Sequence, residues 1–509
     1  MSDTPASTPT EDDARYLALK ARDARFDGRF FTAVTSTGIY CRPVCRVRVP
    51  KPENCRFYVL AAQAEAAGFR PCLRCRPELA PAVAIGVGSM SGATVAWSMQ
   101  DAARILAHQA VHMLDAQHLA GGTRRSIAQV AARLGISERH LRRIFEVQWG
   151  VSPLQYWQTR RLLTAKQLLS DTALPVAQVA LLAGFTSVRR FNDAFVGRYQ
   201  LQPRGLRKKA SSTVGALDSP GVRVKAAYRP PYNIQSMLDF FAARQLAGIE
   251  TVDLAQCTLV RTLTLQHGGG DVSGWIRAKF DPSRYVVELD FSESLVSALP
   301  EVFVRMRAML DLDADPETIN ATIGADFPDT DGLRVPGTLD GFELGVRAIL
   351  GQQITVAAAR TLCNRLVERF GAVIQTPFVG INRLFPAPQI LAAASADALG
   401  ALGITRQRQR AIQALAQAVD SGGLVLRPDV DISGTLEALL ALPGVGPWTA
   451  HYIAMRALRW PDAFPCGDVA LHKALGVQNT KKPSQMAEQA SERWRPWRSY
   501  AVIRAWNSL

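Results

Sequence analysis

Four cysteines near the N-terminus have the spacing of a metal site. Cys41 and Cys45 form a C-x3-C pair, and Cys72 and Cys75 form a C-x2-C pair. Two close pairs brought together by a fold provide the four thiolates that tetrahedral zinc takes. The spacing therefore predicts one Zn²⁺ bound by these four cysteines, with Cys55 expected in the core. A purely structural zinc knuckle is the alternative to a chemical role.

A second group of residues could bind DNA and perform catalysis. Leu442-Pro-Gly-Val-Gly446 is a glycine hairpin that opens a helix, where free N–H groups bind phosphate and glycine permits a close approach. The hairpin residues expected at DNA are Leu442, Gly444, Val445 and Gly446. Asp468 lies twenty residues after Trp448, an interval that resembles the hairpin-to-aspartate spacing of the helix-hairpin-helix glycosylases and so makes Asp468 the candidate catalytic carboxylate. A helix N-cap is its plainer interpretation. Backbone carbonyls of Leu440, Leu442 and Val445 are candidate ligands for a monovalent cation.

Two helix-turn-helix patterns lie between these sites. The segment 126–145 has a short apolar helix, a turn at Gly135 and an Arg-rich helix capped by Ser137, and 176–198 repeats the pattern. The first turns of recognition helices enter the major groove. The side chains expected to face DNA are Glu138, Arg139, Arg142, Arg189, Arg190 and Asn192. A helical bundle with a basic surface is the alternative.

The distribution of charge supports nucleic-acid binding by the front of the chain. Residues 1–209 contain 30 Lys+Arg and 15 Asp+Glu, whereas residues 210–509 contain 29 of each. Such an excess of basic side chains favours a polyanionic partner. No run of eighteen apolar residues and no basic-then-apolar leader occurs, so we expect no membrane contact and a cytoplasmic location.

The length of 509 residues predicts about three or four domains. A polar tail is expected over about 1–13, and small and turn residues predict linkers at about 80–93 and 210–221. Helical periodicity covers 101–199 and the chain after 341. The region between them predicts strands at 222–228, 257–265 and 275–291, the last broken at Asp281-Pro282, and helices at 234–246 and 299–312.

The front half resembles two known families. Phe26-Asp-Gly-Arg-Phe-Phe, Thr37-Gly-Ile-Tyr-Cys41-Arg-Pro and Ala67-Gly-Phe-Arg-Pro-Cys72 resemble the N-terminal domain of Ada-type adaptive-response proteins. That resemblance implies that Cys41 irreversibly accepts a methyl group from a DNA methylphosphotriester. The paired helix-turn-helix units, joined by a long helix at 153–170, resemble AraC-type DNA-binding domains, which implies operator DNA and RNA polymerase as partners.

Residues 222–509 resemble the AlkA-type 3-methyladenine glycosylases of the helix-hairpin-helix superfamily. The resemblance rests on the hairpin-to-Asp468 interval, Tyr228-Arg-Pro-Pro-Tyr232, the run 341–352 and Glu492-Arg-Trp-Arg-Pro-Trp-Arg-Ser-Tyr500. It implies that Asp468 is catalytic. The aromatic residues that it implies for the base pocket are Phe240, Trp448, Tyr452 and Trp506. The helix at 446–458 contains no lysine for a Schiff base, so a monofunctional glycosylase is expected.

Two positions depart from the glycosylase pattern. Val469 replaces an aromatic residue that can follow the catalytic aspartate, and polar Gln353 stands where the family has an apolar intercalating wedge. The rival interpretation is a transcription regulator whose glycosylase fold has lost catalysis.

The expected fold is multidomain α+β, in four modules. They are a zinc-binding α/β domain at 14–80, an all-α double helix-turn-helix at 98–209, a TBP-like antiparallel sheet with helices at 222–335, and an all-α helix-hairpin-helix glycosylase domain at 336–509.

Overall fold

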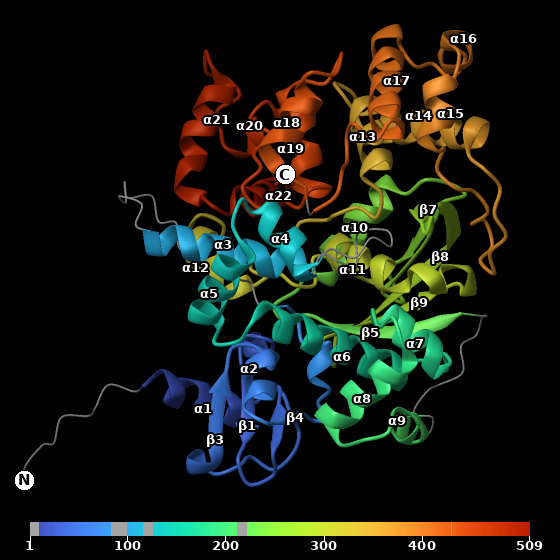
Figure 1. Ribbon diagram of the computed structural model, residues 1–509. Coiled ribbons are helices and arrows are strands. Elements are labelled where there is room, and N and C mark those ends of the chain that lie inside the picture. The colour runs from blue at the N-terminus through green and yellow to red at the C-terminus, as the bar shows by residue number, and fades with distance from the viewer. Residues whose placement is uncertain (1–9, 83–98, 116–125, 211–220, 429) are drawn as a thin grey trace, which may run out of the picture.

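The computed structural model describes residues 10–82, 99–115, 126–210, 221–428 and 430–509. A small sheet domain, a helical region, a larger sheet and a second helical region follow one another along the chain (Figure 1). The multidomain α+β prediction is therefore confirmed. Most of each predicted linker, 83–93 and 211–220, lies outside the described residues.

The N-terminal domain is a four-stranded sheet in the order β3-β1-β2-β4, covered by short helices. The strand β2 pairs antiparallel with β1 and parallel with β4. Its elements are α1 (Glu11–Ala21), β1 (Phe31–Val34), β2 (Ile39–Cys41), β3 (Cys55–Tyr58), α2 (Ala61–Ala66) and β4 (Arg70–Pro71). The predicted tail ends earlier than expected, because Thr10 and Asp13 form a capping box that starts α1 at Glu11.

Seven helices follow in the described residues 99–115 and 126–210. They are α3 (Met99–Asp115), α4 (Ile127–Arg133), α5 (Glu138–Trp149), α6 (Pro153–Asp171), α7 (Val176–Leu182), α8 (Val188–Tyr199) and α9 (Pro203–Ala210). Side chains of Ser137 and Ser187 cap α5 and α8, the second helix of each helix-turn-helix unit. The long helix α6 joins the two units and packs on both of them (Figure 1).

The third region is an antiparallel sheet in the order β5-β9-β8-β7-β6 with helices on it. Its elements are β5 (Val222–Ala227), α10 (Ile234–Arg244), β6 (Glu250–Asp253), β7 (Thr258–His267), β8 (Gly270–Asp281), β9 (Val286–Phe291), α11 (Leu299–Met309) and α12 (Pro316–Ile323). The predicted strand 275–291 is two strands separated at Asp281-Pro282. The edge strand β6 was missed because Glu250-Thr-Val-Asp253 is short and half polar.

The C-terminal region is helical. Its helices are α13 (Gly341–Leu350), α14 (Val356–Phe370), α15 (Pro388–Ala393), α16 (Ala396–Gly400), α17 (Arg406–Asp420), α18 (Ile432–Leu440), α19 (Pro447–Arg456), α20 (Val469–Ala474), α21 (Pro483–Ser491) and α22 (Arg498–Asn507). They enclose two apolar clusters. One is centred on α13, α17 and α19, and the other contains the buried indoles of Trp494 and Trp497.

A buried arginine joins the first and third regions. Arg229, which is fully buried, donates hydrogen bonds to the carbonyls of Asp27, Pro81 and Ala82 on one side and of Asp313 and Ala314 on the other. Arg29 adds a bidentate ion pair with Asp315. Burial lowers the pKa of Arg229 to about 10, so the guanidinium is still charged at neutral pH. Among the described helices, none is long and apolar enough to cross a bilayer.

Candidate metal centre and base-binding cleft

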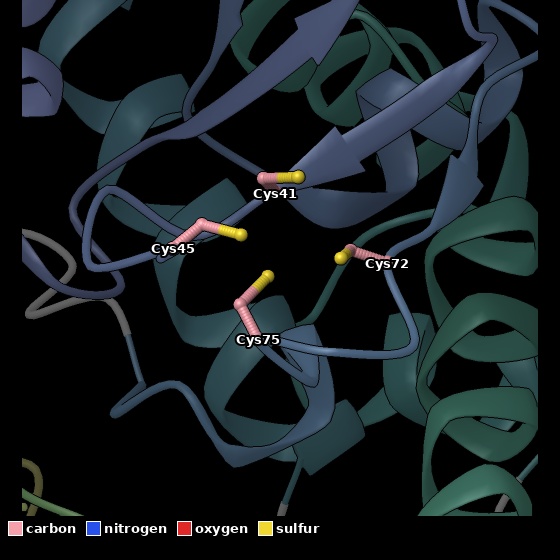
Figure 2. Close-up of side chains that lie close together, drawn as sticks. All are labelled: Cys41, Cys45, Cys72 and Cys75. Carbon is pink, nitrogen blue, oxygen red and sulfur yellow. The ribbon is translucent and has the colours of Figure 1, made fainter. Parts of the chain in front are cut away.

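Strand pairing brings the two cysteine pairs together. Cys41 ends β2, and Cys72 follows β4, whose parallel partner is β2. The Cys72 N–H donates to the Tyr40 carbonyl at 2.9 Å, which fixes the two pairs side by side. All four side chains point toward one centre (Figure 2), and their sulfur atoms lie within 4.8 Å of one another. Zn–S bonds of about 2.3 Å in a tetrahedron fit this spacing. The four thiols are the ligands of one Zn²⁺.

The surroundings of the sulfurs differ. The backbone N–H of Arg42 donates to Cys75 Sγ at 3.3 Å. Three of the cysteines are almost fully buried, and Cys75 is half-buried. Cys55 is a buried residue outside the cluster, as expected.

Two buried carboxylates connect this centre with its neighbours. Arg42, next to Cys41, forms a bidentate bond with Asp27, whose carbonyl accepts from Arg229. Glu65 accepts from Tyr40 in the small sheet at 3.0 Å and from Thr159 on α6 at 2.8 Å. Burial raises the pKa of Glu65 to about 7 against the opposing effect of these hydrogen bonds. Sequence reasoning missed both carboxylates, because a lone Asp or Glu carries no spacing signal.

The side chains expected to contact operator DNA lie on the second helix of each unit. Five of them, Glu138, Arg139, Arg142, Arg189 and Arg190, are exposed, and Asn192 is half-buried. Glu138 and Arg142 form a weak surface pair at 3.8 Å. Exposure leaves these side chains available to DNA, but it does not distinguish base contacts from phosphate contacts.

A cavity of about 1600 Å³ lies between the antiparallel sheet region and the C-terminal helices. Eight of the residues predicted around the glycosylase site line it: Phe240, Gly444, Val445, Gly446, Trp448, Tyr452, Asp468 and Trp506. The ninth, Leu442, packs instead against the apolar cluster of the helical region. The structure thus gathers residues from α10, α19, α20 and α22, which are far apart in the sequence.

The Asp468 carboxylate is held by three N–H donors. Its Oδ2 accepts from Trp448 Nε1 at 2.9 Å, and its Oδ1 accepts from Trp506 Nε1 at 3.0 Å and from the Leu471 backbone N–H at 2.7 Å. The last of these bonds makes Asp468 the N-cap of α20, so the plainer interpretation also holds. Trp448 and Tyr452 stack with ring centroids 5.2 Å apart and an interplanar angle of 14°. The carboxylate is therefore fixed beside an aromatic wall.

The hairpin is tied to the loop that carries Gln353. Gly446 is the N-cap of α19, and Gly444 has a φ of +78°, which favours glycine. Gln352 Nε2 donates to the Gly444 carbonyl and to Thr449 Oγ1, both at 2.9 Å. The neighbouring Gln353 is exposed at the cavity with a φ of +57°. The position implied for the wedge therefore protrudes from a braced turn.

Several charged residues that line the cavity were not predicted from the sequence. Glu250 and Glu343 lie between Arg261 and Arg347 in a network of four ion pairs. Arg244 and Arg456 lie over the Phe240 ring, at 3.7 and 4.7 Å from its centroid. Arg456 was detectable in principle, because it follows Trp448 and Tyr452 at four-residue spacing on one helix face.

Four family models match successive parts of the chain. They are the metal-binding domain of Ada over residues 14–78, a helix-turn-helix domain over 130–209, the AlkA N-terminal domain over 223–340, and the HhH-GPD superfamily base excision DNA repair protein over 346–496. The zinc, helix-turn-helix and helix-hairpin-helix resemblances are therefore confirmed.

Three curated relatives match all or part of the chain. The chain is 37% identical over 503 residues, 97% of its length and 96% of the relative's, to a probable bifunctional transcriptional activator/DNA repair enzyme AlkA of Mycobacterium tuberculosis. It is 36% identical to DNA-3-methyladenine glycosylase 2 of Escherichia coli, over 55% of this chain and 95% of that one. It is also 36% identical to the bifunctional transcriptional activator/DNA repair enzyme Ada of Escherichia coli, over 31% of this chain and 39% of that one. The chain therefore belongs to the AlkA family of bifunctional transcriptional activators and DNA repair enzymes.

Proposed function

We propose that Asp468 is the carboxylate with which this chain hydrolyses the N-glycosidic bond of alkylated purines in DNA. The observation that carries the proposal is the fixed Asp468 side chain, which two indole N–H groups hold at the edge of an aromatic cavity. A regulator without catalysis would have no need of a carboxylate oriented by pocket aromatics. The aromatic residues Phe240, Trp448, Tyr452 and Trp506 form the base pocket.

The residues support a simple sequence of events. An alkylated purine flips from the duplex and stacks on the aromatic wall, which attracts its positive charge. As the C1′–N bond breaks, the Asp468 carboxylate stabilises the positive charge that develops on the sugar and accepts a proton from the attacking water. The helix after the hairpin has no lysine, so hydrolysis is not followed by strand cleavage through a Schiff base.

The remaining predicted contacts position DNA. The hairpin N–H groups of Gly444 and Gly446 bind a phosphate at the start of α19, beside Val445, whose own N–H donates to the Leu442 carbonyl. The hairpin carbonyls remain candidates for a monovalent cation. Exposed side chains of α5 and α8 bind operator DNA, with RNA polymerase as the partner of the activated regulator. The four domain boundaries proposed from the sequence, 14–80, 98–209, 222–335 and 336–509, separate these tasks.

We further propose that Cys41 accepts a methyl group from a DNA methylphosphotriester. Zinc would keep its four ligands deprotonated and nucleophilic, and Cys41 stands at the position that accepts the methyl group in the Ada-type proteins that this domain resembles. Sγ forms the S–CH3 bond as the CH3–O bond breaks, and the oxygen keeps the electron pair as a phosphodiester anion. The centre then changes from −2 to −1, which reduces its repulsion of DNA.

The glycosylase proposal is tested by release of 3-methyladenine and 7-methylguanine from methylated duplex DNA. We expect the wild type to release both bases and Asp468→Asn to be slower by roughly 1,000-fold or more. Asp431→Asn is a matched control, because Asp431 is also a helix N-cap but lies outside the cavity. If the wild type binds DNA but releases no base, the chain is a transcription regulator whose glycosylase fold has lost catalysis. If Asp468→Asn still releases both bases, another residue is catalytic.

The methyl-transfer proposal requires a separate measurement. Labelled methyl groups from methylphosphotriester DNA should be transferred to the wild type, where they should lie on the peptide that contains Cys41. The Cys41→Ala variant should take up no label. Cys55→Ala is the control, because it removes a nearby thiol that is not a ligand. Absence of label on the wild type, with its zinc bound, would leave the zinc domain a structural module.

A further inference from the structure

The cavity face of α19 has a different chemical group at each turn. Trp448, Tyr452 and Arg456 follow one another at four-residue spacing and all line the cavity. Trp448 touches the Asp468 carboxylate. Arg456 lies eight residues further, about 12 Å along the helix axis. This wall therefore runs from an anionic end, at Asp468, through two stacked rings to a cationic end.

Arg456 is a buried cation held by neutral oxygens. It is 6% exposed, and it donates to the carbonyls of Pro336 and Gly337 at 2.8 and 3.1 Å and to Tyr452 Oη at 2.6 Å. Arg244, over the same Phe240 ring, donates to the Phe240 carbonyl. In the part of the chain that the structure describes, neither arginine forms an ion pair with a carboxylate. The cavity wall around Phe240 therefore carries two positive charges.

The bond from Arg456 determines what the Tyr452 hydroxyl can do. A guanidinium only donates, so Tyr452 Oη accepts, and its own proton must point away from Arg456. No acceptor among the described residues takes that proton. Burial alone would raise the pKa of the Tyr452 phenol, but the charges of Arg456 and Arg244 outweigh burial and lower it. The hydroxyl is therefore a strengthened donor at the wall of the cavity.

We infer that the Tyr452 hydroxyl, held and polarised by Arg456, donates a hydrogen bond to the base as it leaves, which makes Arg456 a positioning residue for the leaving-group side of the reaction. The inference rests on the glycosylase function proposed above. Asp468 faces the sugar, where positive charge develops, and the Tyr452–Arg456 pair faces the base, where electron density accumulates. As the C1′–N bond breaks, Asp468 at one end of the wall stabilises the positive charge on the sugar. The Tyr452 hydroxyl at the other end stabilises the electron density on the base.

The charge of the lesion determines how much this donor contributes. When the C1′–N bond breaks, its electron pair passes to the base, and the water oxygen forms the new bond to C1′ while Asp468 takes the proton. A purine with an alkylated, cationic ring leaves as a neutral molecule. A neutral lesion such as hypoxanthine leaves as an anion, which then takes up a proton from solvent. A donor aimed at the base stabilises the anion more than the neutral molecule.

The test compares the two lesion classes in Tyr452→Phe, which removes one oxygen atom and keeps the ring stack. Base release from duplexes that contain a single 7-methylguanine or a single hypoxanthine is followed under single-turnover conditions with saturating enzyme. We expect Tyr452→Phe to slow hypoxanthine release by roughly 100-fold and 7-methylguanine release by less than about tenfold. Tyr500→Phe is the matched control, because its hydroxyl bonds Asp311 outside the cavity. It should slow neither reaction.

Binding to a duplex with a tetrahydrofuran abasic site separates a chemical role from a structural one. This probe has no base, so its Kd should be the same for wild type and Tyr452→Phe. Equal slowing of both lesions, weakened abasic-site binding by Tyr452→Phe, or release of 7-methylguanine but not hypoxanthine by the wild type would overturn the inference. A wild type that releases neither base would instead contradict the proposed function.

Discussion

The zinc centre draws its four ligands from the end of β2 and from the loops that follow β2 and β4 in one small domain, whereas the base cavity draws its walls from two regions that are distant in the sequence. Cys41 and Cys72 meet because β2 and β4 pair directly. Phe240 on α10 and Trp448 on α19 meet only because the antiparallel sheet region packs on the C-terminal helices. The zinc centre therefore depends on local structure and bound metal, and the cavity depends on packing between domains.

The two sites are nevertheless linked through one interface. Arg42 beside the zinc ligands holds Asp27, and the Asp27 carbonyl accepts a hydrogen bond from Arg229 in the glycosylase half. The zinc centre is thus anchored to the antiparallel sheet region, which forms one wall of the base cavity. This contrast identifies which perturbations should stay local and which should reach across the molecule.

Metal removal should have the largest effect. Structural zinc contributes about 10 kcal/mol or more to the folding of small metal domains, so chelation or Cys45→Ala should unfold the small sheet. The measurement is zinc content together with amide hydrogen exchange of residues 10–82. Cys55→Ala, which removes a buried thiol outside the cluster, should keep one zinc per chain. Loss of zinc from Cys55→Ala would contradict the assignment of the four ligands. Retained protection of residues 10–82 from hydrogen exchange in the metal-free protein would show that the small sheet folds without metal.

Replacing Arg229 tests whether the two halves unfold together. Arg229→Met leaves buried carbonyls on both sides of the interface without donors, which should destabilise the protein by about 4 kcal/mol. Hydrogen exchange in urea should then show residues 10–82 opening before the antiparallel sheet, whereas the wild type opens both together. Arg284→Met is the control, because this exposed side chain has a single weak pair. Coincident opening in Arg229→Met would show that the interface does not couple the halves.

Glu65 gives a pH-dependent link between the small sheet and α6. Its pKa is about 7 in the folded protein against 4.5 for an ordinary glutamate, so the folded state binds more protons between these values. Its contribution to stability is fully present below about pH 4.5 and falls by about 3 kcal/mol as the pH rises to about 7. Glu65→Gln should lose that slope in urea unfolding measured at each pH.

A matched variant isolates the effect of burial at Glu65. Glu53→Gln changes an exposed carboxylate in the same domain and should leave the pH slope as in the wild type. An unchanged slope in Glu65→Gln would mean that Glu65 is ionised in the folded protein throughout this range.

The same contrast explains what the sequence could predict. Cys41, Cys45, Cys72 and Cys75 were recognisable because close spacing is itself the signature of a thiolate site. Resemblance supplied Asp468 and the aromatic residues, all of which line one cavity together with the hairpin glycines. Spacing could not reveal that Trp506 Nε1 bonds Asp468, because 38 residues separate them and their contact depends on how α22 packs. Arg229, Arg244 and Glu65 were missed because burial and charge pairing are tertiary properties.

The smallest predicted effect concerns the wedge. Gln353 protrudes at a φ of +57°, and the two hydrogen bonds of Gln352 brace its loop. The loop therefore loses little conformational entropy when the side chain enters DNA. Gln353→Gly keeps that backbone conformation and removes the side chain. We expect it to weaken binding to a tetrahydrofuran duplex by about 1 kcal/mol, roughly fivefold in Kd.

Gln353→Leu sharpens the same comparison, because an apolar side chain gains more from contact with unstacked bases than an amide does. We expect it to bind the tetrahydrofuran duplex severalfold more tightly than the wild type. Gln407→Ala, a change of an exposed glutamine also at the cavity, is the control and should leave Kd unchanged. If Gln353→Gly binds as tightly as the wild type, the gap left by the flipped base is filled by another residue. The bracing of this loop would then serve the hairpin alone, because Gln352 would still hold Gly444 where we propose that the DNA phosphate binds.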